Sequence, residues 1–285
     1  MQPRQKQFAR ALALAILASG VAACAGGHGR GARENVQYTD QPVERLYNRG
    51  ADLLDRHRWA DAVTAFQEVE RQHPYSTWAR RAMLMEAYAQ YQSNDYDKAI
   101  DNAQRFISLH PGNENAPYAY YLVSICYFER ILDVGRDQGI TERALAALND
   151  VVRRYPETSY ARDARLKIDM VYDQLAGKEM EIGRFYLTND QHLAAINRFR
   201  NVVENPNFQR TSHVPEALER LVEAYLSVGM TDQAQRSAAI LGYNYPGNEW
   251  YQRAYALMQT RGVAPVATEE ARRRGWLSRT FGAVF

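Results

Sequence analysis

Residues 50–74 read GADLLDRHRWADAVTAFQEVERQHP, and the spacing of small, apolar and proline residues in this stretch recurs along the chain. The small residue Gly50 is followed twelve positions later by Ala62, and four positions after that by the apolar Phe66. Small residues in two neighbouring helices let their backbones approach closely. A proline such as Pro74 then ends the second helix, because it cannot continue the hydrogen-bond ladder. The spacing therefore predicts a helix–turn–helix unit.

Four further segments repeat this spacing across residues 87–246. Each unit buries its apolar face only against its neighbours, so five units in register indicate a stacked array. The pattern resembles the tetratricopeptide repeat (TPR), a helix–turn–helix unit of about 34 residues. It predicts an all-α TPR superhelix of about five helix–turn–helix repeats over residues 41–260. The segments contain Ala87, Ala99, Ala103, Phe106 and Pro111; Ala144, Leu148, Val151 and Pro156; Gly183, Tyr186, Ala195, Phe199, Val202 and Pro206; and Leu218, Tyr225, Gly229, Ala234, Ala238, Leu241 and Pro246.

Two departures interrupt the array. Residues 133–139 insert between the two helices of the third repeat. Residues 160–175 show helical periodicity ahead of the fourth repeat, and together with residues 178–187 they predict one long helix. Gly177 weakens the join between the two parts, because glycine is a poor helix former.

The composition is that of an ordinary globular protein, with 46% hydrophobic and 24% charged residues in a chain of 285. Of the 35 lysines and arginines, three lie in residues 1–23, which hold no acidic residue. Removing that segment leaves 32 basic residues against 33 acidic ones. A dedicated nucleic-acid-binding domain shows a basic surplus, so we expect no nucleic-acid partner.

Residues 1–23 have the organisation of a bacterial signal peptide, with a basic start and an apolar run at residues 11–21. That run is too short to span a bilayer, which takes about 20 residues. The small residues before Cys24 resemble a lipobox, which predicts cleavage before Cys24 and anchoring through its acyl chains, each buried CH₂ contributing about 0.8 kcal/mol. The alternative is an ordinary secretory signal that leaves a free thiol. Ala25 in place of Asp favours the outer membrane, by resemblance to enterobacterial sorting rules, and residues 24–40, with four glycines, predict a flexible tether.

Residues 261–285 differ from the repeats. A linker is followed by two acids, three arginines and an apolar edge formed by Trp276, Leu277, Phe281 and Phe285. One interpretation is a basic and aromatic tail that docks on a partner or on the membrane surface. A frayed terminus is the alternative.

The sequence carries no recognised catalytic signature: it has no GxSxG, GxGxxG, Walker or HExxH motif. Its six histidines form no cluster with metal-ligand spacing. We therefore expect no enzymatic activity, no cofactor and no bound metal. Cys126 lies in an apolar stretch and is expected to be a buried structural thiol.

The chain has 19 tyrosines, and aromatic residues concentrate in its first three repeats. Repeat stacking buries many of them. Those that stay exposed in the concave groove of a superhelix would offer flat apolar area and a hydroxyl, which suits an extended peptide. The candidates for such a groove are Tyr75, Trp78, Tyr88, Tyr91, Tyr118 and Tyr121.

The lipobox, the tether and the five repeats together resemble the BamD family, lipoproteins of the machinery that assembles outer-membrane β-barrels. The likeness extends over nearly the whole mature chain. The stretches that carry it are His73-Pro74-Tyr75-Ser76, Arg136-Asp137-Gln138, residues 155–164, residues 179–186, residues 194–198 and residues 216–225.

The resemblance implies a non-enzymatic adaptor on the periplasmic face of the outer membrane. Its N-terminal repeats would receive unfolded barrel precursors, and its C-terminal repeats would bind the POTRA domain of BamA. Arg198 matches a family arginine that contacts a BamA carboxylate; a solvent-facing arginine of little energetic worth is the alternative. Other lipoproteins of the complex are expected as partners through the C-terminal tail. The residues expected to bind BamA are Arg184, Tyr186, Asn197 and Arg198.

Two other classes of function stay open at this point. One is a periplasmic TPR adaptor for cell-wall synthesis or division, which would make no contact with BamA. The other is a cell-wall enzyme with an unrecognised active site. That enzyme would need a carboxylate in the groove whose removal abolishes turnover without unfolding the protein.

Overall fold

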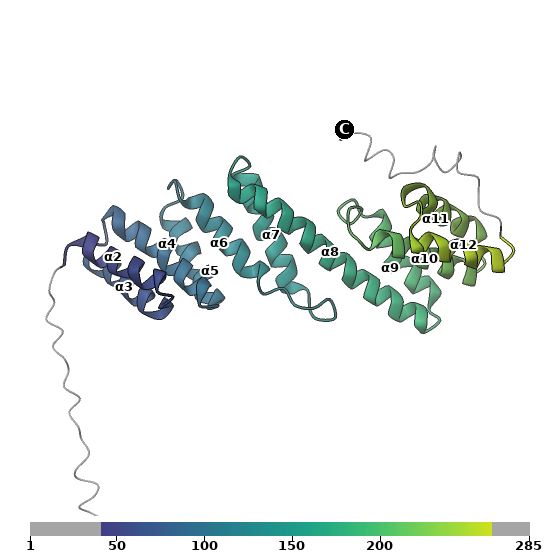
Figure 1. Ribbon diagram of the computed structural model, residues 1–285, viewed down its shortest axis with the longest axis horizontal. Helices are drawn as coiled ribbons and strands as arrows, with labels where there is room; N and C mark the ends of the chain where they lie inside the picture. Colours follow the sequence, from purple (N-terminus) through teal and green to yellow (C-terminus); the bar gives the residue numbers. More distant parts are fainter. Residues whose placement is uncertain (1–40, 264–285) are drawn as a thin grey trace, which may run out of the picture. The chain divides into compact units, whose positions relative to one another are not determined.

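The computed structural model describes residues 41–263, and all regular structure in that range is helical (Figure 1). The predicted signal peptide, the predicted tether and residues 264–285 of the predicted tail lie outside the described residues. The eleven helices of the described range are α2 (Val43–Asp55), α3 (Trp59–Gln72), α4 (Thr77–Gln92), α5 (Tyr96–Leu109), α6 (Ala116–Phe128), α7 (Gly139–Arg154), α8 (Ser159–Thr188), α9 (His192–Glu204), α10 (Val214–Ser227), α11 (Thr231–Asn244) and α12 (Glu249–Thr260).

The helices pack in sequence order, each against the next, which confirms the all-α TPR prediction. The predicted helix-ending prolines all fall at the same place, two residues after the last residue of α3, α5, α7, α9 and α11. Side-chain caps begin three of the following helices. Ser76 Oγ accepts a hydrogen bond from Ala79 N at 3.0 Å, Thr158 Oγ1 accepts one from Ala161 N at 3.2 Å, and Asn248 Oδ1 accepts one from Trp250 N at 2.9 Å.

Two glycines make the close helix–helix contacts that the repeat spacing predicts. A Cβ added at Gly50 would lie 2.6 Å from Cε1 of Phe66, and one added at Gly183 would lie 2.4 Å from Cε1 of Phe199. Both phenylalanines are fully buried. The same glycine–phenylalanine contact therefore fixes the spacing of α2 against α3 and of α8 against α9.

The long helix predicted across Gly177 is confirmed: α8 runs through that residue for 30 residues. The space beside Gly177 is occupied by Val134 of the insertion and by His213 ahead of α10, each 3.1 Å from the position of an added Cβ. The first part of α8 packs in a cluster with Leu148 of α7, and its second part packs in a cluster with Phe199 of α9. One helix thus closes the third repeat and opens the fourth.

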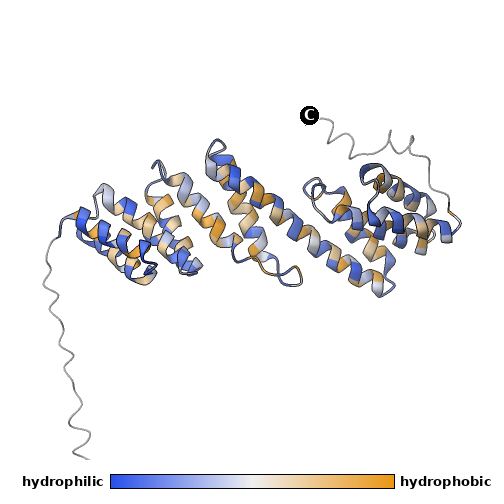
Figure 2. Ribbon diagram, in the orientation of Figure 1, coloured by the Kyte–Doolittle hydropathy of each residue, from blue (hydrophilic) through white to orange (hydrophobic). Residues whose placement is uncertain are grey.

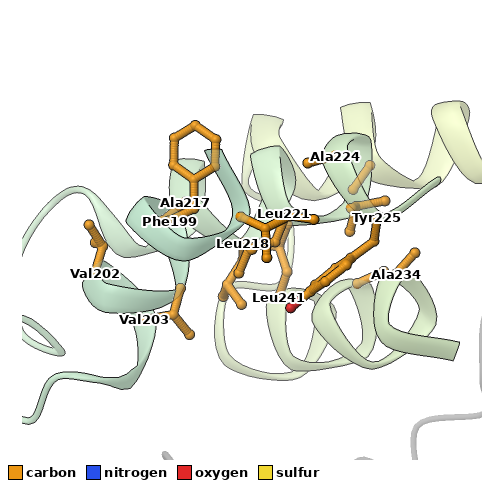
Figure 3. Close-up of a cluster of buried hydrophobic side chains, with 14 of the residues drawn as sticks. Phe199, Val202, Val203, Ala217, Leu218, Leu221, Ala224, Tyr225, Ala234 and Leu241 are labelled. Carbon is orange, nitrogen blue, oxygen red and sulfur yellow. The ribbon is translucent and has the colours of Figure 1, made fainter. Parts of the chain in front are cut away.

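Hydrophobic residues lie at intervals along every helix (Figure 2), and the C-terminal cluster of buried side chains is drawn in Figure 3. Ala254 and Met258 of α12 enter that cluster, so a helix that sequence analysis did not identify covers the last repeat. Cys126 is fully buried, as expected, and burial raises the pKa of its thiol to about 12. None of the helices in residues 41–263 combines the length and apolarity needed to cross a bilayer.

Candidate functional site

Four of the six predicted groove aromatics gather in one place, on α4 and α6, together with one tyrosine of α8. The ring centroid of Tyr160 lies 5.6 Å from that of Tyr118 and 5.2 Å from that of Tyr121. Tyr88 and Tyr91 are close enough to Tyr118 to act on it electrostatically. These five residues are all half-buried and are called the tyrosine cluster below.

Two hydroxyls of the tyrosine cluster, those of Tyr118 and Tyr121, keep their protons well above neutral pH. Burial raises the pKa of Tyr118 far above its ordinary value. Burial also raises the pKa of Tyr121, whose hydroxyl donates a 2.6 Å hydrogen bond to Asp163 Oδ2. Burial opposes ionisation of Asp163, but this hydrogen bond and the ammonium of Lys167 hold the pKa of its carboxyl below the usual range. The cluster is therefore an apolar surface with hydroxyl donors, and Asp163 is an anion at its edge.

The other two predicted groove aromatics lie elsewhere. Trp78 packs against Tyr47 of α2, with ring centroids 4.9 Å apart, and the guanidinium of Arg81 lies 5.5 Å from its ring centroid. Tyr75 stands on the turn between α3 and α4 and is 95% exposed. Trp78 is thus half-buried in the first repeats, and Tyr75 offers its whole ring to solvent.

Three of the four predicted partner-binding residues line one depression between α8 and α9. It has a volume of about 340 Å³ and is called the Arg198 depression below. Arg198 Nη1 lies 3.3 and 3.5 Å from the two carboxylate oxygens of Glu179, and the Arg198 side chain stays 41% exposed. These long contacts leave the guanidinium much of its bonding capacity. The depression is lined by Glu179, Tyr186, Ala194, Asn197, Arg198 and Asn201.

Arg184, the fourth predicted residue, points to a different neighbour. Its Nη1 donates to both carboxylate oxygens of Glu216 on α10, at 3.1 and 3.2 Å. Glu216 keeps 16% of its side chain exposed. Arg184 therefore ties α8 to α10 and does not line the Arg198 depression.

Sequence analysis missed a buried carboxylate next to this bridge. The side chain of Glu219 on α10 is only 7% exposed, and burial raises its pKa to about 7. Its Oε2 lies 3.5 Å from Arg220 Nε, and neither atom has a hydrogen-bond partner within residues 41–263. Trp250 of α12 lies against the same region, its ring centroid 5.7 Å from the Arg220 guanidinium and 4.6 Å from that of Arg253. No sequence signal marks this site, because glutamates at helical spacing are usually solvated.

Over the part of the chain that the structure describes, no three His, Cys, Asp or Glu side chains are grouped so as to hold a metal ion. The features that stand out are two surfaces that share α8. The tyrosine cluster lies at its beginning and the Arg198 depression near its end.

Comparison with known proteins identifies the family. The model of the YfiO family, described as an outer membrane lipoprotein, matches residues 39–240. The outer membrane protein assembly factor BamD of Caulobacter vibrioides is 59% identical over 254 residues, which cover 89% of this chain and 82% of that protein. BamD of Rickettsia prowazekii is 44% identical over 218 residues, which cover 76% and 86%.

Among solved structures, a TPR protein from Thermus thermophilus matches this chain with lower sequence identity. It is 20% identical, with 77% of this chain and all of that chain covered and a TM-score of 0.34. The identification rests on the family model and on the two sequence relatives. The chain belongs to the BamD family of outer membrane protein assembly factors.

Proposed function

We propose that this chain is a lipid-anchored adaptor, without enzymatic activity of its own, that works at the periplasmic face of the outer membrane. In this proposal the tyrosine cluster holds unfolded barrel precursors, and the Arg198 depression holds the POTRA region of BamA. The observation that carries the proposal is the presence of two chemically different surfaces along one continuous helix, α8. Membership of an assembly-factor family favours this function over the cell-wall alternative.

The chemistry of the tyrosine cluster suits an unfolded chain. Half-buried rings supply apolar area to any side chain. Apart from Tyr121, whose hydroxyl donates to Asp163, the tyrosines offer hydroxyl donors to backbone carbonyls. Neither contact depends on a particular sequence, so a surface of this kind accepts many different precursors.

The chemistry of the Arg198 depression suits a folded partner that presents a carboxylate. Glu179 holds Arg198 by long contacts, and the guanidinium has donors to spare for a second carboxylate. If binding excludes water from such a pair, removing one partner typically costs about 2–5 kcal/mol.

The test is affinity purification of the lipidated protein from gently solubilised membranes, with wild type, Arg198→Glu and Arg200→Glu in parallel. Arg200 is the matched control, because it lies on the same helix with a similarly exposed side chain, 47% against 41%. We expect wild type and Arg200→Glu to retain BamA and Arg198→Glu to lose it.

Two results would contradict the proposal. If Arg198→Glu retains BamA, the chain still binds BamA, but the Arg198 depression is not the binding site. Retrieval of cell-wall proteins alone by wild type would replace the whole proposal with the cell-wall adaptor.

A further inference from the structure

Two large apolar side chains stand exposed beside the Arg198 depression. Phe185 of α8 is 62% exposed and Leu193 of α9 is 66% exposed. Phe185 directly precedes Tyr186, and the two rings meet edge to face with centroids 5.8 Å apart. Leu193 lies one helical turn before Asn197, on the same face of α9. Because Tyr186 and Asn197 both line the depression, each exposed apolar side chain lies next to a residue of its lining.

Hydrogen bonds in the turn between α8 and α9 order the backbone that links the two residues. The carbonyl of Phe185 accepts hydrogen bonds from Thr188 Oγ1 at 2.9 Å and from Asn189 Nδ2 at 2.7 Å. The amide of Gln191 closes the turn onto the carbonyl of Tyr186 at 2.9 Å. The end of α8 and the start of α9 thus form one hydrogen-bonded unit, so the backbone that presents the two side chains need not be ordered on binding.

We propose that Phe185 and Leu193 are the apolar anchors of the BamA-binding surface. This inference rests on the proposed function and adds to it the kind of partner surface required: a carboxylate surrounded by apolar side chains. The guanidinium of Arg198 favours a partner carboxylate, because it is 41% exposed and its contacts to Glu179 are long, at 3.3 and 3.5 Å. Apolar contacts on both sides of the depression exclude water from the pair between Arg198 and the partner carboxylate, which strengthens it.

The structure offers matched controls for this proposal. Leu166 and Met170 are apolar residues in the first part of α8 with nearly the same exposure, 67% and 60%. A serine at either position removes as much exposed apolar area as a serine at Phe185 or Leu193, and it does so far from the depression along the helix. A non-specific effect of removing exposed apolar area would therefore weaken binding equally in the variants at Leu166 and Met170 and in those at Phe185 and Leu193.

The experiment measures the Kd of the full mature chain for full-length BamA in detergent. The variants are Phe185→Ser, Leu193→Ser, Leu166→Ser and Met170→Ser, with Arg198→Glu as the reference. Far-ultraviolet circular dichroism and thermal unfolding are recorded for each to show that it is folded. We expect Phe185→Ser and Leu193→Ser each to raise Kd about tenfold or more, as truncated anchor residues do. Leu166→Ser and Met170→Ser should bind as wild type does.

The outcomes separate this inference from the proposed function. If Arg198→Glu abolishes binding while Phe185→Ser and Leu193→Ser bind normally, the anchors are wrong and the proposed function stands. If the two control variants weaken binding as much as the anchor variants, the loss of affinity is not specific to the Arg198 depression, and the inference is overturned. If wild type does not bind BamA, the proposed function fails, and the inference fails with it.

Discussion

Replacing Glu219 by glutamine is predicted to stabilise the protein at alkaline pH and to have little effect at acid pH. The carboxyl of Glu219 is 7% exposed, and burial raises its pKa from 4.5 to about 7. Between these two values the folded chain binds a proton that the unfolded chain has released. The free energy of unfolding therefore falls as the pH rises through this window. A glutamine has no charge to bury, so the variant escapes that loss.

The size of the effect follows from the shift. One pKa unit corresponds to about 1.4 kcal/mol, so the upper bound for the full shift is about 3 kcal/mol above pH 7. For a chain of this length, 1 kcal/mol changes the melting temperature by about 2–4 °C. We expect Glu219→Gln to melt above wild type at pH 8, by at most about 6–12 °C, and the difference to vanish near pH 4.5.

The assay is thermal unfolding of residues 24–285 at several pH values between 4.5 and 8, monitored by circular dichroism. Glu223→Gln is the matched control, because it removes a carboxylate from the same helix with a 37% exposed side chain. The reasoning is refuted if the stability difference between Glu219→Gln and wild type stays constant over this pH range. It is also refuted if the variant is the less stable protein at pH 8.

Three further substitutions test the packing, each by urea unfolding. Gly183→Ala places a methyl 2.4 Å from Cε1 of Phe199 and should lower the free energy of unfolding by about 1–3 kcal/mol. Unchanged stability would mean that α8 and α9 can move apart without loss of packing. Glu86→Ala leaves the amides of Gln67, Gln90 and Asn102 without their shared acceptor and should cost about 2–3 kcal/mol; a cost near zero would count against the network. Tyr121→Phe removes the hydrogen bond to Asp163 and should cost about 1 kcal/mol; a stabilised variant would contradict its importance. The matched controls are Gly112→Ala, Glu68→Ala and Tyr75→Phe.

The two proposed surfaces share a structural cause. Both use α8, which is long because the chain continues through Gly177 where the repeat pattern would break. A side chain at Gly177 would meet Val134 and His213, so glycine there lets two loops pack on the middle of the helix. The cost of glycine inside a helix, about 1 kcal/mol, is offset by this packing. Gly177 therefore lowers the helix propensity of α8 at this point but allows the tertiary packing that stabilises the helix there.

The amino-acid sequence by itself determined the repeat architecture. Helix ends are set locally by residues such as Pro74, and the pairing of helices is set by small residues such as Gly50 opposite a large one such as Phe66. These signals lie within a few turns of each other, so their effect can be read from spacing alone. The grouping of Tyr186 with Arg198 could also be predicted, from the likeness to a known family.

Only the tertiary structure decided which of these side chains meet and which stay in water. Arg184 and Tyr186 are two residues apart, but on a helix they point to different sides, one to α10 and the other to the Arg198 depression. Trp78, a groove candidate in the sequence, packs on α2 instead. Glu219 is buried at α10, although nothing in the sequence marks it. Exposure, pKa and ion pairing depend on how much water the neighbouring helices remove. That quantity is fixed by packing between residues far apart in the chain, which is why spacing within a single repeat does not reveal it.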